Sequence, residues 1–281
     1  MTPGTRLQLR GPMPDNEKNS DSAPGVGARW KRLAESADSV YRDAPAPPAK
    51  IEAMAGSGYL APLLAATPAD GLVLEAGCGS GTLSLAAAWR GRRVVGLDIS
   101  PEVLANLQRN AARLAEQVGR PFAVAAVCGD LERLPFADGA FAGAINEGVV
   151  EHWLDRDARR AVIAEMARVV RPGGVVVVCV PNGRHPLIGF WERTGYPGFA
   201  RSRSVPWHRY GWRDLADDLA AAGLADVRAD GLSPFSTIAV WPNWAPLRAL
   251  AAVLRRLLPE PRWLRRRCGF NLIAFGRVAD K

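Results

Sequence analysis

Residues 73–88, which read VLEAGCGSGTLSLAAA, decide the fold of this 281-residue chain. The stretch begins as a short apolar run typical of a buried strand and ends as an Ala- and Leu-rich helix. Between the two lie Gly77, Gly79 and Gly81, each separated from the next by one small residue. Glycine allows a sharp turn and a close approach of a ligand to the backbone, so this turn is typical of a nucleotide-binding site between a strand and a helix.

The spacing of the glycines excludes two common kinds of nucleotide site. A dinucleotide fingerprint, G-x-G-x-x-G, requires a third glycine where this chain has Thr82. The G-x-x-x-x-G-K-[ST] pattern of a P-loop does not occur. Taken alone, the turn leaves open a purely structural role or another nucleotide-binding fold.

Two aspartates follow the next two expected strands. Asp98 ends residues 93–98, about twenty residues after the glycine turn, where a carboxylate can accept hydrogen bonds from both hydroxyls of a ribose. Asp130 ends residues 122–130, where it can accept a hydrogen bond from an exocyclic amino group. The alternatives are a carboxylate facing a helix dipole for Asp98 and a turn-forming residue for Asp130.

Strands and helices alternate from Gly71 to the C-terminus, which predicts an α/β protein with a doubly wound, mostly parallel sheet. Residues 175–182 (VVVVCVPN) form an unbroken apolar run typical of a strand buried on both faces. The expected strands cover residues 72–77, 93–98, 122–130, 139–148, 175–182, 224–232 and 270–278, and the longest expected helices cover residues 101–118, 155–170 and 212–224.

The rest of the chain divides into three kinds of segment. Residues 1–28 contain few apolar residues and are expected to be a disordered tail. Residues 29–70 are expected to form helices that cover the ligand site, one over 29–41 and one over 50–64. Within the domain spanning 71–281, the aromatic and basic insertions 183–210 and 233–268 are expected to form one lid over an apolar pocket.

Composition argues against several classes of protein. The chain is 48% hydrophobic, but it has no stretch of eighteen apolar residues that would predict a transmembrane helix. The N-terminus lacks the apolar core of a signal peptide, which favours a cytoplasmic protein. The four cysteines form no C-x-x-C pair, and no H-x-x-H motif or carboxylate cluster predicts a metal site.

The net charge of +8 is concentrated in one segment. Seven arginines lie between Arg248 and Arg267, with Glu260 as the single acidic residue among them. Leucines at helical spacing from Leu247 to Leu258 complete a basic amphipathic pattern. Residues 246–267 therefore predict either a helix that contacts an anionic membrane peripherally or an ordinary packed helix with a solvated basic face. RNA binding is disfavoured because no RNA-binding module accompanies the charge.

Four strings in this order resemble the class I S-adenosylmethionine-dependent methyltransferases, specifically the small-molecule (type 11) group that includes ubiquinone and menaquinone methyltransferases. They are VLEAGCGSGTLSLAAA (73–88), VVGLDIS (94–100), CGDLERLPFADGAFAGAINEGVVEHW (128–153) and EMARVVRPGGVVVVCVPN (165–182). The resemblance implies a seven-stranded Rossmann-like sheet and S-adenosyl-L-methionine as the cofactor.

The resemblance also implies a role for each matching residue. Glu75, Gly77 and Gly79 would hold the methionine end of the cofactor. Asp98 would bind the ribose with Ile99 against the adenine, and Asp130 would accept from the adenine amino group with Leu131 beside it. Asn146 and Glu147, at the end of the fourth strand, would line the methyl-transfer site. Tyr41 and Tyr59 would close the cofactor site from the N-terminal helices.

The predicted function is methyl transfer to the O, N or C atom of a small hydrophobic or aromatic acceptor. The candidate bases are Glu147, Glu151 and the three histidines, His152, His185 and His208, and of these Glu147 and His152 are favoured. His152 also fits a hydrogen-bonded structural histidine. One alternative is a protein or RNA methyltransferase. It is disfavoured because Asn146-Glu147-Gly148 differs from the N/D-P-P-Y/F motif of many adenine and glutamine N-methyltransferases. The other alternative is a cofactor-binding protein without catalytic activity. The oligomeric state is not predicted.

Overall fold

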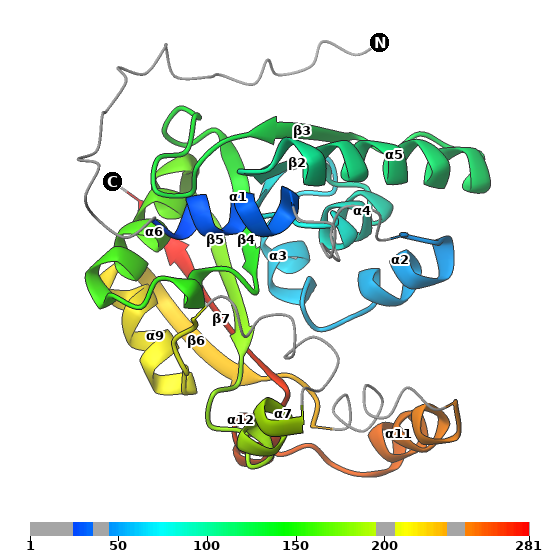
Figure 1. Cartoon of the computed structure of the whole chain (residues 1–281), viewed down its shortest axis with the longest axis vertical. Coiled ribbons are helices and arrows are strands. Elements are labelled where there is room, and N and C mark those ends of the chain that lie inside the picture. Colours follow the sequence, from blue (N-terminus) through cyan, green and yellow to red (C-terminus); the bar gives the residue numbers. More distant parts are fainter. Residues whose placement is uncertain (1–24, 36–44, 195–205, 235–244, 281) are drawn as a thin grey trace.

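A seven-stranded sheet with the order β3-β2-β1-β4-β5-β7-β6 forms the centre of the molecule (Figure 1). The computed structural model describes residues 25–35, 45–194, 206–234 and 245–280. Only the pairings of β7 with β5 and β6 are antiparallel, which confirms the predicted mostly parallel sheet. The strands are β1 (Leu72–Ala76), β2 (Arg93–Asp98), β3 (Val124–Cys128), β4 (Phe141–Glu147), β5 (Val170–Pro181), β6 (Leu224–Gly231) and β7 (Asn271–Val278).

Helices cover both faces of the sheet, so alternate strand residues enter two different cores. In β1, Val73 packs against one layer of helices and Leu74 against the other. The first layer contains α2 (Pro48–Ala55), α3 (Ala61–Ala66), α4 (Thr82–Trp89) and α5 (Pro101–Val118), and the second contains α6 (Arg156–Val169) and α9 (Trp212–Ala221). Burial on both faces explains why the central strands are almost continuously apolar.

The N-terminal segment differs from its prediction in two places. Helix α1 (Val26–Glu35) begins before residue 29, so residues 26–28 do not belong to a disordered tail. Residues 1–24 and 36–44 lie outside the described residues. The single helix expected over 50–64 is divided between α2 and α3, because Gly56 and Gly58 interrupt the helical segment and Pro62 favours the first turn of a new helix.

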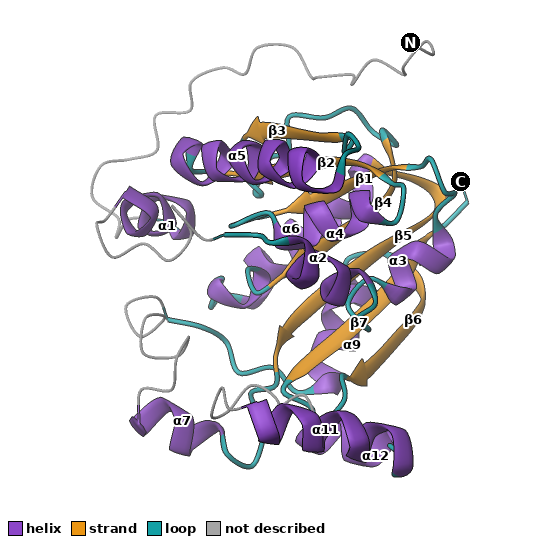
Figure 2. Ribbon diagram, turned by 90° about the vertical axis from the view of Figure 1, so that its right-hand side faces the viewer, coloured by secondary structure: helices purple, strands orange, loops and turns teal. Residues whose placement is uncertain are grey.

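Both insertions begin at the carboxyl edge of the sheet. Strand β6 runs parallel to β5 because both pair antiparallel with β7. Helices α7 (Ile188–Thr194), α11 (Ala245–Leu257) and α12 (Arg262–Cys268) lie together at one end of the molecule in both views (Figures 1 and 2). The insertions also touch, because His185 Nε2 lies 3.1 Å from Cys268 O. Asn182, directly before the first insertion, donates from Nδ2 to Arg266 O at 3.1 Å.

None of the helices in the described ranges is both long enough and apolar enough to cross a membrane.

Candidate active site

The glycine turn is held against the end of the neighbouring strand. The backbone N–H groups of Gly77 and Cys78 both donate to Leu97 O at 2.8 Å. Gly77 has φ +80° and Gly81 has φ +74°, a region that favours glycine. A Cβ atom on Gly77 would lie 2.7 Å from Val149 Cγ2, so a side chain would collide with the segment that follows β4. The turn therefore requires glycine for both backbone conformation and space.

Asp98 is built into this turn and also faces the cavity beside it. Its Oδ2 accepts from Gly79 N at 3.0 Å and its Oδ1 accepts from Ser100 N at 3.1 Å. Burial raises the pKa of the carboxyl group, although these backbone donors oppose the shift. A carboxylate offers about four acceptor positions, so lone pairs remain for the two hydroxyls of a ribose. The donor set thus fits a ribose at this position.

The expected adenine subsite lies beside Asp98 and is covered by α1. Asp130 Oδ1 accepts from Glu132 N at 2.9 Å, and Leu131 is buried next to it. A Cβ atom on Gly27 of α1 would lie 2.6 Å from Ile99 Cδ1, so the helix backbone packs directly over Ile99. The absence of a side chain at Gly27 permits this contact.

One cavity of about 240 Å³ brings most of the predicted site residues together. Gly27, Trp30 and Met54 from the N-terminal helices also line it. Sequence reasoning expected helices to cover the site but singled out Tyr41 and Tyr59 as the contacts. Tyr41 lies outside the described residues, and Tyr59 does not line the cavity. The predicted residues in the lining are Glu75, Gly77, Gly79, Asp98, Ile99, Asp130, Leu131 and Glu147.

Asn146 does not line the cavity, contrary to the role expected from the resemblance. Its side chain is fully buried. Nδ2 donates to Ala76 O at 2.6 Å, and Oδ1 accepts from Val150 N at 3.2 Å. Asn146 therefore joins the ends of β1 and β4 and begins the short helix η1 (Val150–His152), which corrects its assignment from a cofactor contact to a structural link.

His152 is also absent from the cavity lining. Its Nδ1 lies 3.1 Å from Pro206 O, and its ring packs edge-on against Trp30 with centroids 4.8 Å apart. Burial lowers the pKa of the imidazole. These contacts favour the structural interpretation of His152, because its ring supports Trp30 in the wall of the cavity.

Three carboxyl groups are buried at the end of the cavity formed by β1 and β4. Desolvation raises the pKa of Glu75 to about 8, although a hydrogen bond from Ser84 Oγ opposes the shift. Desolvation also raises the pKa of Glu147, and it raises that of Glu151 to about 8. Glu75 and Glu147 line the cavity, and Glu151 lies behind Gly148. Acids with raised pKa values exchange protons near neutral pH more readily than exposed carboxylates.

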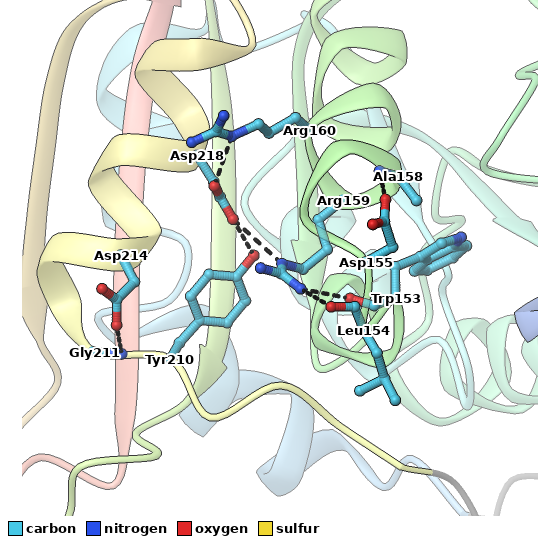
Figure 3. Close-up of polar contacts among 10 residues, drawn as sticks. All are labelled: Trp153, Leu154, Asp155, Ala158, Arg159, Arg160, Tyr210, Gly211, Asp214 and Asp218. Atoms are coloured by element: carbon cyan, nitrogen blue, oxygen red, sulfur yellow. Dashed lines mark hydrogen bonds and ion pairs between the residues drawn. The ribbon is translucent and has the colours of Figure 1, made fainter.

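A buried ion pair holds the wall that carries Trp153 (Figure 3). Asp218 of α9 accepts from Arg159 Nε at 3.3 Å, from Arg160 Nε at 2.9 Å and from Tyr210 OH at 2.9 Å. Arg159 Nη1 donates to the carbonyl oxygen of Trp153 at 2.9 Å. The cluster therefore connects α6 and α9 to a segment that lines the cavity, and no sequence motif predicted it.

Residues 73–174 match the family model described as a methyltransferase domain. The chain carries a methyltransferase domain. The matched residues contain the glycine turn, Asp98, Asp130 and Glu147, so this domain provides most of the cavity lining.

Curated relatives match the methyltransferase domain and its immediate surroundings. A probable S-adenosylmethionine-dependent methyltransferase of Mycolicibacterium smegmatis is 36% identical over 110 residues, which cover 39% of this chain and 38% of the relative. The demethylmenaquinone methyltransferase of Beutenbergia cavernae is 34% identical over 165 residues, which cover 54% of this chain and 62% of that protein. The similarity therefore spans only about a third to two thirds of these relatives.

Solved methyltransferase structures share the fold over most of this chain. The phosphoethanolamine N-methyltransferase 2 of Haemonchus contortus, solved with S-adenosyl-L-methionine, superposes with a TM-score of 0.59 at 16% identity. The superposition covers 92% of this chain and 61% of that protein. It confirms the predicted Rossmann-like methyltransferase fold.

The described parts of the two insertions contribute no residue to the cavity lining. Its cover comes from α1 and α2 through Gly27, Trp30 and Met54. Residues 195–205 and 235–244 lie outside the described residues. Helices α7, α11 and α12 therefore do not cover the cavity as the expected lid would. They form a separate surface at the same edge of the sheet.

Proposed function

We propose that this chain transfers a methyl group from S-adenosyl-L-methionine to a small apolar acceptor. The observation that carries the proposal is the joint placement of Glu75, Gly77, Asp98 and Asp130 around one cavity. Their order matches the groups of the cofactor: carboxyl and backbone groups at the methionine end, a carboxylate for the ribose and an acceptor for the adenine amino group.

The cofactor supplies, when bound, an electrophilic methyl group on a positively charged sulfur. The residues of the chain hold that group in place, exclude water and accept the proton that the acceptor loses. Glu147 is the proposed proton acceptor because it lines the cavity and has a raised pKa. We assign His152 a positioning role through its contact with Trp30.

The walls of the cavity and the name of one relative support the proposed class of acceptor. Trp30, Met54, Leu83, Val149 and Trp153 give the cavity apolar surfaces beside its carboxyl groups. The Beutenbergia relative is named for a demethylmenaquinone substrate. We therefore favour an aromatic or isoprenoid molecule with an ionisable hydroxyl group, handled by a protein in the cytoplasm.

Isothermal calorimetry with S-adenosyl-L-methionine and NAD in parallel tests the cofactor. We expect S-adenosyl-L-methionine to bind more tightly, because the turn lacks the third glycine of a dinucleotide site. Tighter binding of NAD would contradict the proposal.

Transfer of a radiolabelled methyl group to hydroquinones, unstructured RNA and denatured protein then tests the acceptor. Labelling of the hydroquinone supports the proposal. Labelling of RNA or protein alone would favour the alternative classes of substrate, and cofactor binding without any labelling would favour a non-catalytic protein. Glu147→Gln should abolish labelling and keep cofactor binding, because the amide preserves shape but cannot accept the proton.

A further inference from the structure

Exposed apolar side chains are concentrated at one end of the molecule. Eight large hydrophobic residues are exposed among the described residues, and all except Leu154 belong to the two insertions. Patches of this kind on an otherwise polar surface mark sites of interaction with a partner or a membrane. The seven are Leu187, Phe190, Leu250, Val253, Leu257, Leu258 and Trp263, and we call this set the apolar end.

Helix α11 presents one apolar stripe to the protein and another to solvent. Ala251 is buried, and Leu254 is half-buried. Leu250, Val253 and Leu257 follow one another at helical spacing and are 46%, 51% and 70% exposed. The apolar arc of the helix is thus wider than the contact with the rest of the protein requires, and its outer part is left without cover among the described residues.

The arginines of this segment fall into two groups with different contacts. Arg265 donates to Asp230 and, through Nη1, to Glu260 O at 2.8 Å, and Arg266 donates to Ala229 O at 2.9 Å. These two side chains attach α12 to β6. Arg256, Arg262 and Arg267 are exposed instead, although Arg262 Nε also lies 3.9 Å from Asp230 Oδ2. Arg267 lies one turn after Trp263 on the same face of α12.

We propose that the apolar end docks on an anionic lipid bilayer. Leu250, Val253, Leu257 and Trp263 would enter the interface, and Arg256, Arg262 and Arg267 would contact anionic headgroups. Trp263, at 66% exposure, has the amphipathic ring that suits the boundary between headgroups and acyl chains.

Charge favours a bilayer over the other occupants of such a surface. A second copy of the chain would bring its own arginines against these arginines, and like charges in one interface are unfavourable. Nucleic acid would use the arginines but would leave the aliphatic stripe of α11 exposed to water. A bilayer with anionic lipid satisfies both features of the surface.

The position of this surface relates it to the candidate active site. The apolar end and the cavity both lie at the carboxyl edge of the sheet. A bilayer bound there would bring an apolar acceptor to the edge that carries the cavity. Vesicle binding itself does not depend on the proposed function, so each can fail without the other.

Cosedimentation of the full chain with vesicles tests the proposal. Vesicles of phosphatidylcholine mixed with phosphatidylglycerol should bind the chain, whereas vesicles of phosphatidylcholine alone should bind it at least about tenfold more weakly. High salt should weaken binding because exposed charges are screened. Equal binding to both vesicles, or no binding at low salt, would overturn the proposal.

Two variants separate the charged and the apolar contributions. Arg256→Gln/Arg262→Gln/Arg267→Gln should lower vesicle affinity on the order of a hundredfold, at roughly fivefold for each charge near the surface. Leu257→Ala/Trp263→Ala should lower it roughly tenfold or more. The matched controls are Arg90→Gln/Arg113→Gln/Arg171→Gln and Leu154→Ala, which remove exposed residues elsewhere and should leave binding unchanged.

Three further outcomes would contradict the proposal. Equal losses in the control variants would show that net charge alone, and not this surface, drives binding. A dimer in light scattering that Leu257→Ala/Trp263→Ala converts to a monomer would assign the surface to a second copy of the chain. RNA binding that depends on the three arginines, without vesicle binding, would assign it to nucleic acid. Cofactor affinity, measured in every variant, should stay unchanged and reports that each protein is folded.

Discussion

The two halves of the carboxyl edge differ in where they place charge. Beside β1, β2 and β4, the carboxyl groups of Glu75, Asp98 and Glu147 are drawn into a cavity and have raised pKa values. Beside β5, β6 and β7, arginines and apolar side chains face outward. One half therefore suits a small molecule enclosed by protein, and the other suits an extended anionic surface.

The comparison teaches that the same sheet edge can supply two functions because its loops differ in length. Short turns after β1 and β2 keep backbone N–H groups and carboxylates close to the strands. The long segments after β5 and β6 carry helices of their own, which move their side chains away from the sheet. The predictions that follow test whether the two halves are independent.

The largest effect is expected at the cluster that holds the cavity wall. Asp218→Ala would leave the buried guanidinium of Arg159 without its carboxylate, which should lower the free energy of unfolding by ~3–5 kcal/mol. Urea denaturation measures the loss. Asp217→Ala, an exposed neighbour on the same helix, is the control and should change stability by less than about 0.5 kcal/mol. Equal losses for the two variants would show that the cluster does not stabilise the wall.

The next effect concerns the ribose subsite. Asp98→Ala should weaken S-adenosyl-L-methionine binding by roughly 2–4 kcal/mol, or about thirtyfold or more, because hydrogen bonds to a charged group contribute about 1.5–3 kcal/mol each and are not additive. Calorimetry measures the change, with the exposed Asp70→Ala as the control. An unchanged dissociation constant would place the ribose elsewhere. Vesicle binding should be the same for both variants if the halves are independent.

A smaller effect is expected from the buried acid behind the cavity. The pKa of Glu151 rises from 4.5 to about 8 in the folded chain, so the native state binds this proton more tightly than the unfolded state. The resulting stabilisation is complete below about pH 4.5, decreases as the pH rises, and is lost above about pH 8. Glu151→Gln removes the titration, so wild type should lose roughly 2 kcal/mol relative to the variant between about pH 5 and pH 7.

Denaturation of both proteins across this pH range measures the difference. Glu116→Gln, which changes an exposed residue of α5, should follow the wild-type curve throughout. Parallel curves for wild type and Glu151→Gln would mean that Glu151 stays ionised in the folded chain.

The sequence predicted one half of the edge better than the other for a physical reason. Glycine turns and strand-end aspartates can be recognised in short stretches of sequence. One turn brings the glycines together, and the parallel order of the strands brings the aspartates to the same edge of the sheet. Asn146 was misassigned because its position at a strand end predicts its neighbourhood but not its side-chain direction. Its hydrogen bond to Ala76 O joins two strands that are seventy residues apart.

Contacts between distant segments explain the other differences. The cover provided by Gly27 and Trp30 depends on α1 packing against Ile99 and Asp130, which follow β2 and β3 and lie about seventy to a hundred positions away. Asp230 decides which arginine side chains are attached to the rest of the protein. The sequence placed the strand of Asp230 correctly, but it did not indicate which arginines Asp230 contacts. The basic amphipathic pattern of residues 246–267 could be recognised in the sequence. Only the structure shows which of its apolar side chains are exposed to solvent.

The smallest effect separates two arginines that are two residues apart. Arg265 is paired with Asp230 and Glu260 O, whereas Arg267 is exposed beside Trp263. Arg265→Gln should lower the free energy of unfolding by about 1 kcal/mol and leave vesicle binding near the wild-type value, because its guanidinium is already used within the protein. Arg267→Gln should change stability by less than about 0.5 kcal/mol and weaken vesicle binding roughly fivefold. Since both substitutions remove one positive charge, net charge cannot explain a difference between them, and the opposite pattern would mean that α12 faces the bilayer through its other side.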